Sequence, residues 1–135
     1  MLTGINHLTL TVSDIDASLH FYQRLGFTAH VRWDGGAYLS VGDLWLCLSL
    51  GNPQPARDYT HIAFDTDADG FMALQQMVGQ DNLVEWKTNR SEGQSLYIAD
   101  PDGHQLEIHL GDLHSRLRSL KTQPYPGLVW LSDKP

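Results

Sequence analysis

The sequence consists of two halves that repeat the same order of predicted elements, and this repeat constrains the fold more than any other feature. In the first half, residues 5–12 alternate polar and apolar side chains, as a half-buried strand does. A helix is expected to follow, with Ser13 as N-cap, Asp16 in a capping-box position and Gly26 at its end. Three further strands fit residues 27–33, 37–41 and 44–50.

The second half has the same pattern. Residues 59–66 alternate like residues 5–12, a helix is expected over 67–78, and strands fit 83–87, 94–99 and 105–110. We therefore predict an α+β fold of paired βαβββ modules within one domain spanning residues 1–135. Its parts are a first module at 1–50, a linker at 51–58, a second module at 59–112 and a C-terminal tail at 113–135.

The two faces of the predicted sheets differ in chemistry. One face carries the aliphatic side chains and is expected to pack under the helices. The other face combines imidazoles, hydroxyls and aromatic rings, a mixture typical of a concave ligand site. Its members are His7, Thr9, Tyr38, Ser40, Trp45, Cys47, His61, Ser95, Tyr97, Gln105, Glu107 and His109.

A metal site is predicted on this second face. Glu107 lies inside a strand between Leu106 and Ile108, where a carboxylate needs a partner. His7 and His61 occupy corresponding positions in the two halves. Two imidazoles and one carboxylate suit a divalent metal with open positions for substrate. The sequence leaves His109 unassigned, and the remaining histidines are expected to be hydrogen-bonded: His20, His30, His104 and His114.

Charge narrows the class of ligand. The chain has a net charge of −7, which argues against nucleic-acid and anionic membrane partners. Basic residues nevertheless concentrate at Lys87, Arg90, Arg116, Arg118 and Lys121, which favours an anionic small molecule. The oxygen-rich loop at 89–95 fits either a cation-binding loop or an ordinary hairpin turn.

A cytoplasmic location is expected from the use of cysteine. Cys47 is the single cysteine, so no intrachain disulfide can form, and it is interpreted as a small buried hydrophobe. No apolar run is long enough to span a bilayer. Residues 1–12 contain no Lys or Arg and do not resemble a signal peptide.

Nearly the whole chain resembles the fosfomycin-resistance glutathione transferases of the vicinal-oxygen-chelate superfamily. The motif Asp-Pro-Asp-Gly-His at 100–104 is common across that superfamily, whereas the strand 45–49 and the loop 89–93 are more specific. The segments that carry the resemblance are 5–10, 32–34, 36–39, 43–49, 58–61, 89–93, 100–104 and 124–127.

The resemblance implies a particular set of ions and an assembly. His7, His61 and Glu107 would bind Mn²⁺ within cup-shaped sheets, and Cys47 would not be a ligand. Loop residues would bind K⁺, namely Asn89, Ser91, Gly93 and Ser95. The family forms homodimers in which each metal site takes its first-half ligand from one chain and its second-half ligands from the other.

The resemblance also implies the reaction. Glutathione thiolate would open the epoxide of fosfomycin and so inactivate the antibiotic, with Thr9 and Tyr38 in catalytic roles. Trp33, Tyr38 and Arg90 would lie on the glutathione side. The residues implied to bind fosfomycin are Thr9, Trp45, Lys87, Ser91, Ser95, Tyr97 and Arg116.

Other functions remain open at the level of sequence. A fosfomycin epoxide hydrolase of the same superfamily needs a general base, and such relatives place a Glu where this chain has Gly36. A ring-cleaving dioxygenase or a glyoxalase would also use a metal. A drug-sequestering binding module would not need the metal triad.

Overall fold

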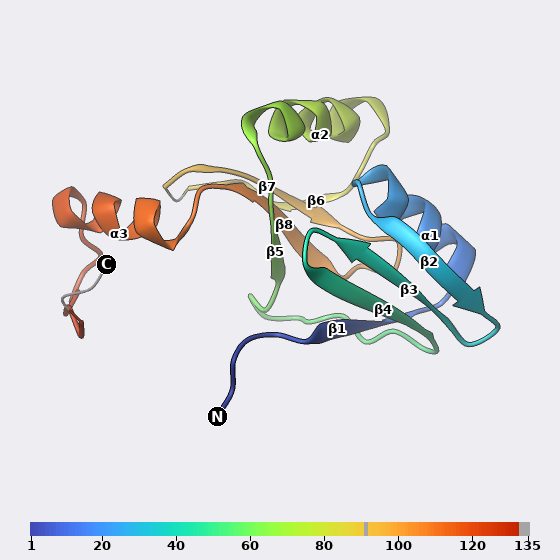
Figure 1. Cartoon of the computed structure of the whole chain (residues 1–135). Coiled ribbons are helices and arrows are strands. Elements are labelled where there is room, and N and C mark those ends of the chain that lie inside the picture. Colours follow the sequence, from blue (N-terminus) through green and yellow to red (C-terminus); the bar gives the residue numbers. More distant parts are fainter. Residues whose placement is uncertain (91, 133–135) are drawn as a thin grey trace. The chain divides into compact units, whose positions relative to one another are not determined.

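The computed structural model describes residues 1–90 and 92–132 (Figure 1). The chain divides into two compact units: Met1–Thr60 with Ala99–Gln105, and His61–Ile98 with Leu106–Pro135. In the described part of the chain, no helix is long and apolar enough to cross a membrane.

The first unit is a four-stranded sheet with one helix. Its elements are β1 (His7–Val12), α1 (Ile15–Arg24), β2 (Thr28–Trp33), β3 (Gly36–Val41) and β4 (Leu44–Leu50). The strand order is β1-β4-β3-β2, with β1 parallel to β4 and the other pairs antiparallel. The aliphatic face of the sheet and the inner face of α1 form the core, which includes Val12, Ile15, Tyr22, Leu39 and Leu46.

The second unit repeats this arrangement. Its elements are β5 (Ile62–Asp65), α2 (Ala68–Gln80), β6 (Glu85–Lys87), β7 (Gln94–Ala99), β8 (Gln105–Leu110) and α3 (Leu113–Thr122). The strand order β5-β8-β7-β6 matches the first sheet, and β5 is parallel to β8. The predicted α+β fold of two βαβββ modules is therefore confirmed, and the predicted tail begins with a helix, α3.

The turn between β7 and β8 packs with the first unit, although it follows β7 of the second in the sequence. Asp100 accepts hydrogen bonds from the Tyr22 hydroxyl at 2.7 Å and from the backbone N–H groups of Asp102 and His104 at 3.0 and 2.9 Å. His104 Nε2 donates to the Thr11 carbonyl oxygen at 2.7 Å. The Asp-Pro-Asp-Gly-His motif thus stabilises the first unit.

The start of α1 corrects one prediction. The N-cap is Asp14, whose Oδ1 accepts from the Ala17 N–H at 3.0 Å, and not Ser13. The Ser13 N–H instead donates to the Asp102 carboxylate at 3.1 Å. Asp16 forms no capping box and pairs with Arg32 Nε at 2.7 Å. Ser13 and Asp16 therefore bind residues distant in sequence, Asp102 and Arg32, and neither caps the helix.

Replacement of Asp100 by Ala is expected to destabilise the protein. Burial, followed by the nearby Asp100 charge, raises the pKa of Tyr22, so its phenol stays protonated and needs an acceptor. Asp100→Ala leaves this buried hydroxyl and two amides without their partner, and we expect urea denaturation to show a loss of ~2–4 kcal/mol in unfolding free energy. The exposed turn residue Asp43 provides the control, with Asp43→Ala expected within ~0.5 kcal/mol of wild type. Equal stability of the two variants would contradict this role.

Candidate functional site

A pocket of about 390 Å³ lies on the polar and aromatic face of the first sheet. Strand pairing places Thr9, Cys47 and Tyr38 in one row across β1, β4 and β3. Five of the predicted site residues line this pocket: His7, Thr9, Trp33, Tyr38 and Trp45. The pocket is lined by His7, Thr9, Trp33, Gly35, Tyr38, Trp45, Cys47, Leu48 and Ser49.

One wall of this pocket is a chain of four rings. The His7 ring lies 4.5 Å from that of Trp45, Trp45 lies 5.2 Å from Tyr38, and Tyr38 lies 4.8 Å from Trp33, measured between ring centroids. Tilted and edge-to-face contacts of this kind stabilise aromatic pairs beyond their burial. The rings therefore form an ordered wall whose outer edges remain open to solvent.

The hydrogen bond of His7 determines which ring nitrogen can bind a metal. Its Nδ1 lies 2.7 Å from Asn6 Oδ1, which can only accept. Nδ1 therefore carries the proton, and Nε2 presents a lone pair, the usual state of a metal-binding imidazole. The sequence analysis missed Asn6, although its place directly before His7 was available as a signal.

The second unit contains a buried carboxylate, that of Glu107, which is only 7% exposed. Oε1 lies 2.9 Å from His61 Nε2, and Oε2 accepts from the Ser95 hydroxyl at 2.6 Å. The His61 ring also faces Trp86 and Tyr97 at centroid distances of 5.5 and 6.1 Å. The partner that a carboxylate inside a strand requires is therefore present, and it is one of the predicted metal ligands.

The His61–Glu107 pair fits a divalent metal ion. The 2.9 Å between Nε2 and Oε1 is the distance of a hydrogen bond, and neighbouring ligand atoms on an octahedral ion with bonds of ~2.1 Å lie at a similar separation, about 3.0 Å. No group of three or more His, Cys, Asp and Glu residues suited to a metal occurs within the described ranges 1–90 and 92–132. The structure thus brings together two of the three predicted ligands, while His7 belongs to the first unit, and the metal site stays a prediction.

Among the basic residues predicted to bind an anion, Lys87 lies on β6, Arg90 in the loop after it, and Arg116 on α3. Lys87 Nζ lies 4.7 Å from the centroid of the Tyr97 ring. Arg116 Nε donates to Glu92 Oε2 at 3.0 Å, and its Nη1 donates to the Tyr125 hydroxyl at 3.3 Å. The hydrogen bond from Arg116 lowers the pKa of Glu92. Arg90 is exposed.

The loop before β7 contains the residues predicted to bind K⁺. Asn89 Nδ2 donates to the Gly93 carbonyl oxygen at 2.9 Å, and Gly93 has a φ of 81°. Ser95 is buried against Glu107, whereas Ser91 lies outside the described residues. The K⁺ site stays a prediction.

Comparison with known proteins establishes the family. Residues 4–108 match the Glyoxalase/Bleomycin resistance protein/Dioxygenase superfamily. The chain belongs to this superfamily. It is 47% identical over 140 residues to the glutathione transferase FosA of Serratia marcescens, with 99% of each chain covered. It is also 38% identical to the metallothiol transferase FosB of Shouchella clausii, with 92% of each covered. The resemblance to fosfomycin-resistance glutathione transferases is thus confirmed.

Solved structures of other superfamily members share the fold. A variant of the fosfomycin resistance protein FosX from Listeria monocytogenes, in complex with Mn(II) and 1S,2S-dihydroxypropylphosphonic acid, superposes with a TM-score of 0.79 at 27% identity. The alignment covers 88% of this chain and 98% of that one. FosX from Mesorhizobium loti gives a TM-score of 0.75 at 27% identity, covering 87% and 99%.

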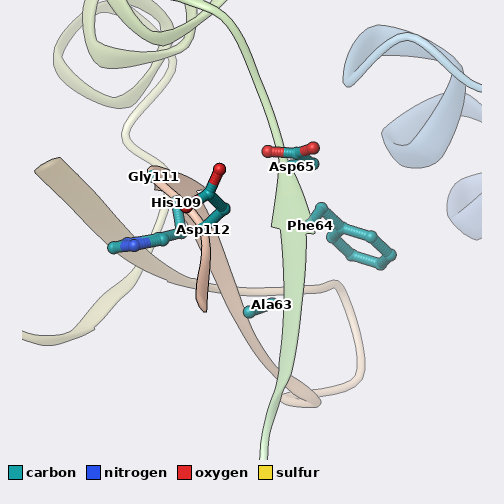
Figure 2. Close-up of a pocket in the computed structure, with 6 residues that line it drawn as sticks. All are labelled: Ala63, Phe64, Asp65, His109, Gly111 and Asp112. Atoms are coloured by element: carbon teal, nitrogen blue, oxygen red, sulfur yellow. The ribbon is translucent and has the colours of Figure 1, made fainter. Parts of the chain in front are cut away.

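A second pocket of the present protein, of about 280 Å³, lies in its second unit (Figure 2). Ala63, Phe64 and Asp65 line it from β5, and His109, Gly111 and Asp112 line it from the end of β8 onward. The sequence had left His109 unassigned. Its Nδ1 lies 2.6 Å from Ser95 Oγ, which connects it to the Glu107 carboxylate.

Gly36 has no room for a side chain. A Cβ at this position would lie 2.5 Å from the Leu48 carbonyl oxygen and 2.7 Å from Cζ2 of Trp33. The Trp33 indole thus occupies the space that a larger residue at position 36 would need. A Glu here, where hydrolase relatives are expected to carry their base, would require the pocket wall to move.

Gly36→Ala is therefore expected to disturb the pocket. Because the added methyl meets both backbone and indole, we expect ~1–3 kcal/mol of destabilisation and a change in tryptophan fluorescence. Gly79, in α2, is the matched control because a Cβ there meets nothing within 4 Å. Gly79→Ala should be neutral or stabilising. A Gly36→Ala variant with wild-type stability and fluorescence would refute this packing argument.

Proposed function

We propose that this protein is a metal-dependent glutathione transferase that inactivates fosfomycin by adding the thiol to its epoxide. The observation that carries the proposal is the buried Glu107 carboxylate, 2.9 Å from His61, in a chain 47% identical to FosA along its length. A single cysteine and the use of glutathione fit a cytoplasmic enzyme.

His61, Glu107 and His7 would hold the metal, which we propose to be Mn²⁺. The donor set is two imidazoles and one carboxylate, and the hydrogen bond to Asn6 leaves His7 Nε2 with a lone pair. A divalent ion bound there would supply Lewis-acid chemistry for opening the epoxide. FosX provides a precedent, because its structure contains Mn(II).

Cationic side chains would bind the phosphonate. Lys87 lies over the Tyr97 ring, and Arg116 is held by Glu92, so both charges are oriented before substrate arrives. We propose that a K⁺ ion on the loop adds positive charge, with Asn89, Ser91, Gly93 and Ser95 as its ligands. The remaining phosphonate and epoxide contacts would come from Thr9, Trp45, Ser91, Ser95 and Tyr97.

The aromatic pocket of the first unit would receive the thiol. Trp33 and Tyr38 stand in its wall, and Arg90 would attract the acidic co-substrate. The thiolate sulfur attacks an epoxide carbon, the C–O bond breaks, and the oxygen takes up a proton. The Thr9 hydroxyl would donate a hydrogen bond to this oxygen, while the Tyr38 hydroxyl would stabilise the thiolate.

We propose that the active form is a homodimer with shared metal sites. His7 would come from one protomer, and His61 and Glu107 from the other. The family resemblance supports this assembly.

Water addition is the second candidate. The diol in the FosX structure is the compound formed when water opens an epoxypropylphosphonate, and that structure shares this fold. A hydrolase needs a carboxylate base near the epoxide. Gly36 stands where that base is expected, and the Trp33 indole fills the adjoining space, so thiol addition is favoured.

The mass of the product tests the proposal. The protein is incubated with fosfomycin, glutathione, Mn²⁺ and K⁺, and then with each component omitted. We expect the mass of the fosfomycin–glutathione adduct, and only when both glutathione and Mn²⁺ are present. A diol formed without thiol would establish hydrolysis, and unreacted fosfomycin in every mixture would refute both reactions.

Variants connect this activity to the site. We expect His61→Gln to lower kcat/KM at least ~100-fold through loss of the metal. Lys87→Met should lower kcat/KM ~10²- to 10³-fold through loss of charge stabilisation. His20→Gln is the control, because His20 is an exposed residue of α1 outside the pocket. A His61→Gln variant as active as His20→Gln would exclude His61 as a ligand.

A further inference from the structure

We propose that His109 is a positioning residue that fixes the Glu107 carboxylate through the Ser95 hydroxyl. This inference rests on the proposed function, because it assigns Glu107 as a metal ligand. His109 follows Glu107 by two residues on the same face of β8, yet nothing in the family argument gives it a role.

Four polar side chains form one continuous series of contacts in the second unit. His109 Nδ1 lies 2.6 Å from Ser95 Oγ, and Ser95 Oγ donates to Glu107 Oε2 at 2.6 Å. The other carboxylate oxygen lies 2.9 Å from His61 Nε2. Ser95 is only 8% exposed, so water does not compete effectively for these bonds.

The number of available protons determines which atom donates in each hydrogen bond between His109, Ser95 and Glu107. A serine hydroxyl has one hydrogen, and a carboxylate can only accept. Since the Ser95 hydrogen points to Glu107, the bond between Ser95 and His109 requires a proton on Nδ1. Nδ1 also lies 3.3 Å from Glu107 Oε2, where an unprotonated nitrogen would direct its lone pair at negative charge. The geometry therefore selects the Nδ1–H tautomer of His109.

Two glycines leave the space that the imidazole ring occupies. A Cβ on Gly93 would lie 2.9 Å from His109 Cε1, and a Cβ on Gly111 would lie 2.8 Å from His109 Nε2. Both glycines have positive φ values, of 81° and 148°. The ring thus fills space that these glycines leave free, and it contacts the loop that contains the predicted K⁺ ligands.

The consequence concerns the direction of the carboxylate. With Oε2 held by Ser95, Oε1 is the oxygen that faces His61. Replacing a residue that orients a metal ligand in this way commonly weakens metal binding about 10- to 100-fold. His109 Nδ1 contacts the Ser95 hydroxyl, which in turn holds Glu107, so a supporting role suits His109 better than direct ligation.

The first test is the affinity of the full-length protein for Mn²⁺, measured by electron paramagnetic resonance of the free ion. We expect His109→Ala to weaken binding ~10- to 100-fold. His109→Asn should restore affinity close to wild type, because an Asn amide can place a donor near the Nδ1 position. His30→Ala is the matched control: His30 Nε2 lies 2.7 Å from Ser40 Oγ, a similar His–Ser contact with no carboxylate.

A double-mutant cycle separates positioning from general stability. Because His109 is proposed to act through Ser95, His109→Ala should cause no further loss of Mn²⁺ affinity in a Ser95→Ala background. Additive losses would overturn the proposed connection. So would a His109→Ala variant that binds Mn²⁺ like wild type.

The tautomer of His109 can be measured in the wild-type protein, without any variant. Nitrogen-15 NMR of the metal-free wild-type protein should show a proton on Nδ1 of His109, as its contact with the Ser95 oxygen requires. Protonation at Nε2 alone would overturn the inference even if the variants failed to fold. A wild-type protein that binds Mn²⁺ but forms no adduct would refute the proposed reaction alone, whereas one that binds no Mn²⁺ would overturn the metal site and this inference together.

Discussion

The second unit is organised around a single buried carboxylate. An unpaired Glu107 side chain would carry a large desolvation penalty, which its contacts with His61 and Ser95 offset. His61 directly precedes β5, Ser95 lies on β7 and Glu107 on β8, so the carboxylate constrains the register of the strands that surround it. A shift of one residue would turn Glu107 toward the aliphatic core and replace it with Leu106 or Ile108.

Strand register also explains why the two repeats are not equivalent. In the first sheet β1 pairs with β4 so that Thr9 faces Cys47, and in the second sheet β5 pairs with β8 so that Ala63 faces Glu107. Cys47 therefore occupies the position in the first unit that Glu107 occupies in the second. Glu107 therefore has no carboxylate counterpart in the first unit, whereas each half has a histidine at the start of its first strand: His7 is the first residue of β1, and His61 directly precedes β5. The proposed ligands His7, His61 and Glu107 come from both halves of the repeat.

Local patterns predicted the strands well, because the alternation of side chains depends only on neighbours in the sequence. The start of α1 was missed because Ser13 is bound by Asp102, 89 residues away. The same limit applies to the site. Residue type and repeat position singled out His7, His61 and Glu107, but the ring of Trp33 over Gly36 and the contact of His109 with Ser95 arise from strand pairing. Asn6 could have been noticed from its position beside His7.

The two units carry different kinds of side chain, and this difference matters for the proposed reaction. The pocket of the first unit is lined by aromatic, hydroxyl, thiol, imidazole and aliphatic groups, with no Lys, Arg, Asp or Glu among the described residues that line it. The second unit contains the buried carboxylate, Lys87 and Arg116. A substrate with an anionic head and a reactive carbon needs fixed charge at one end and an ordered, weakly polar surface for the attacking thiol at the other. Each unit offers one of these environments, and this division of chemistry supports the proposal made above.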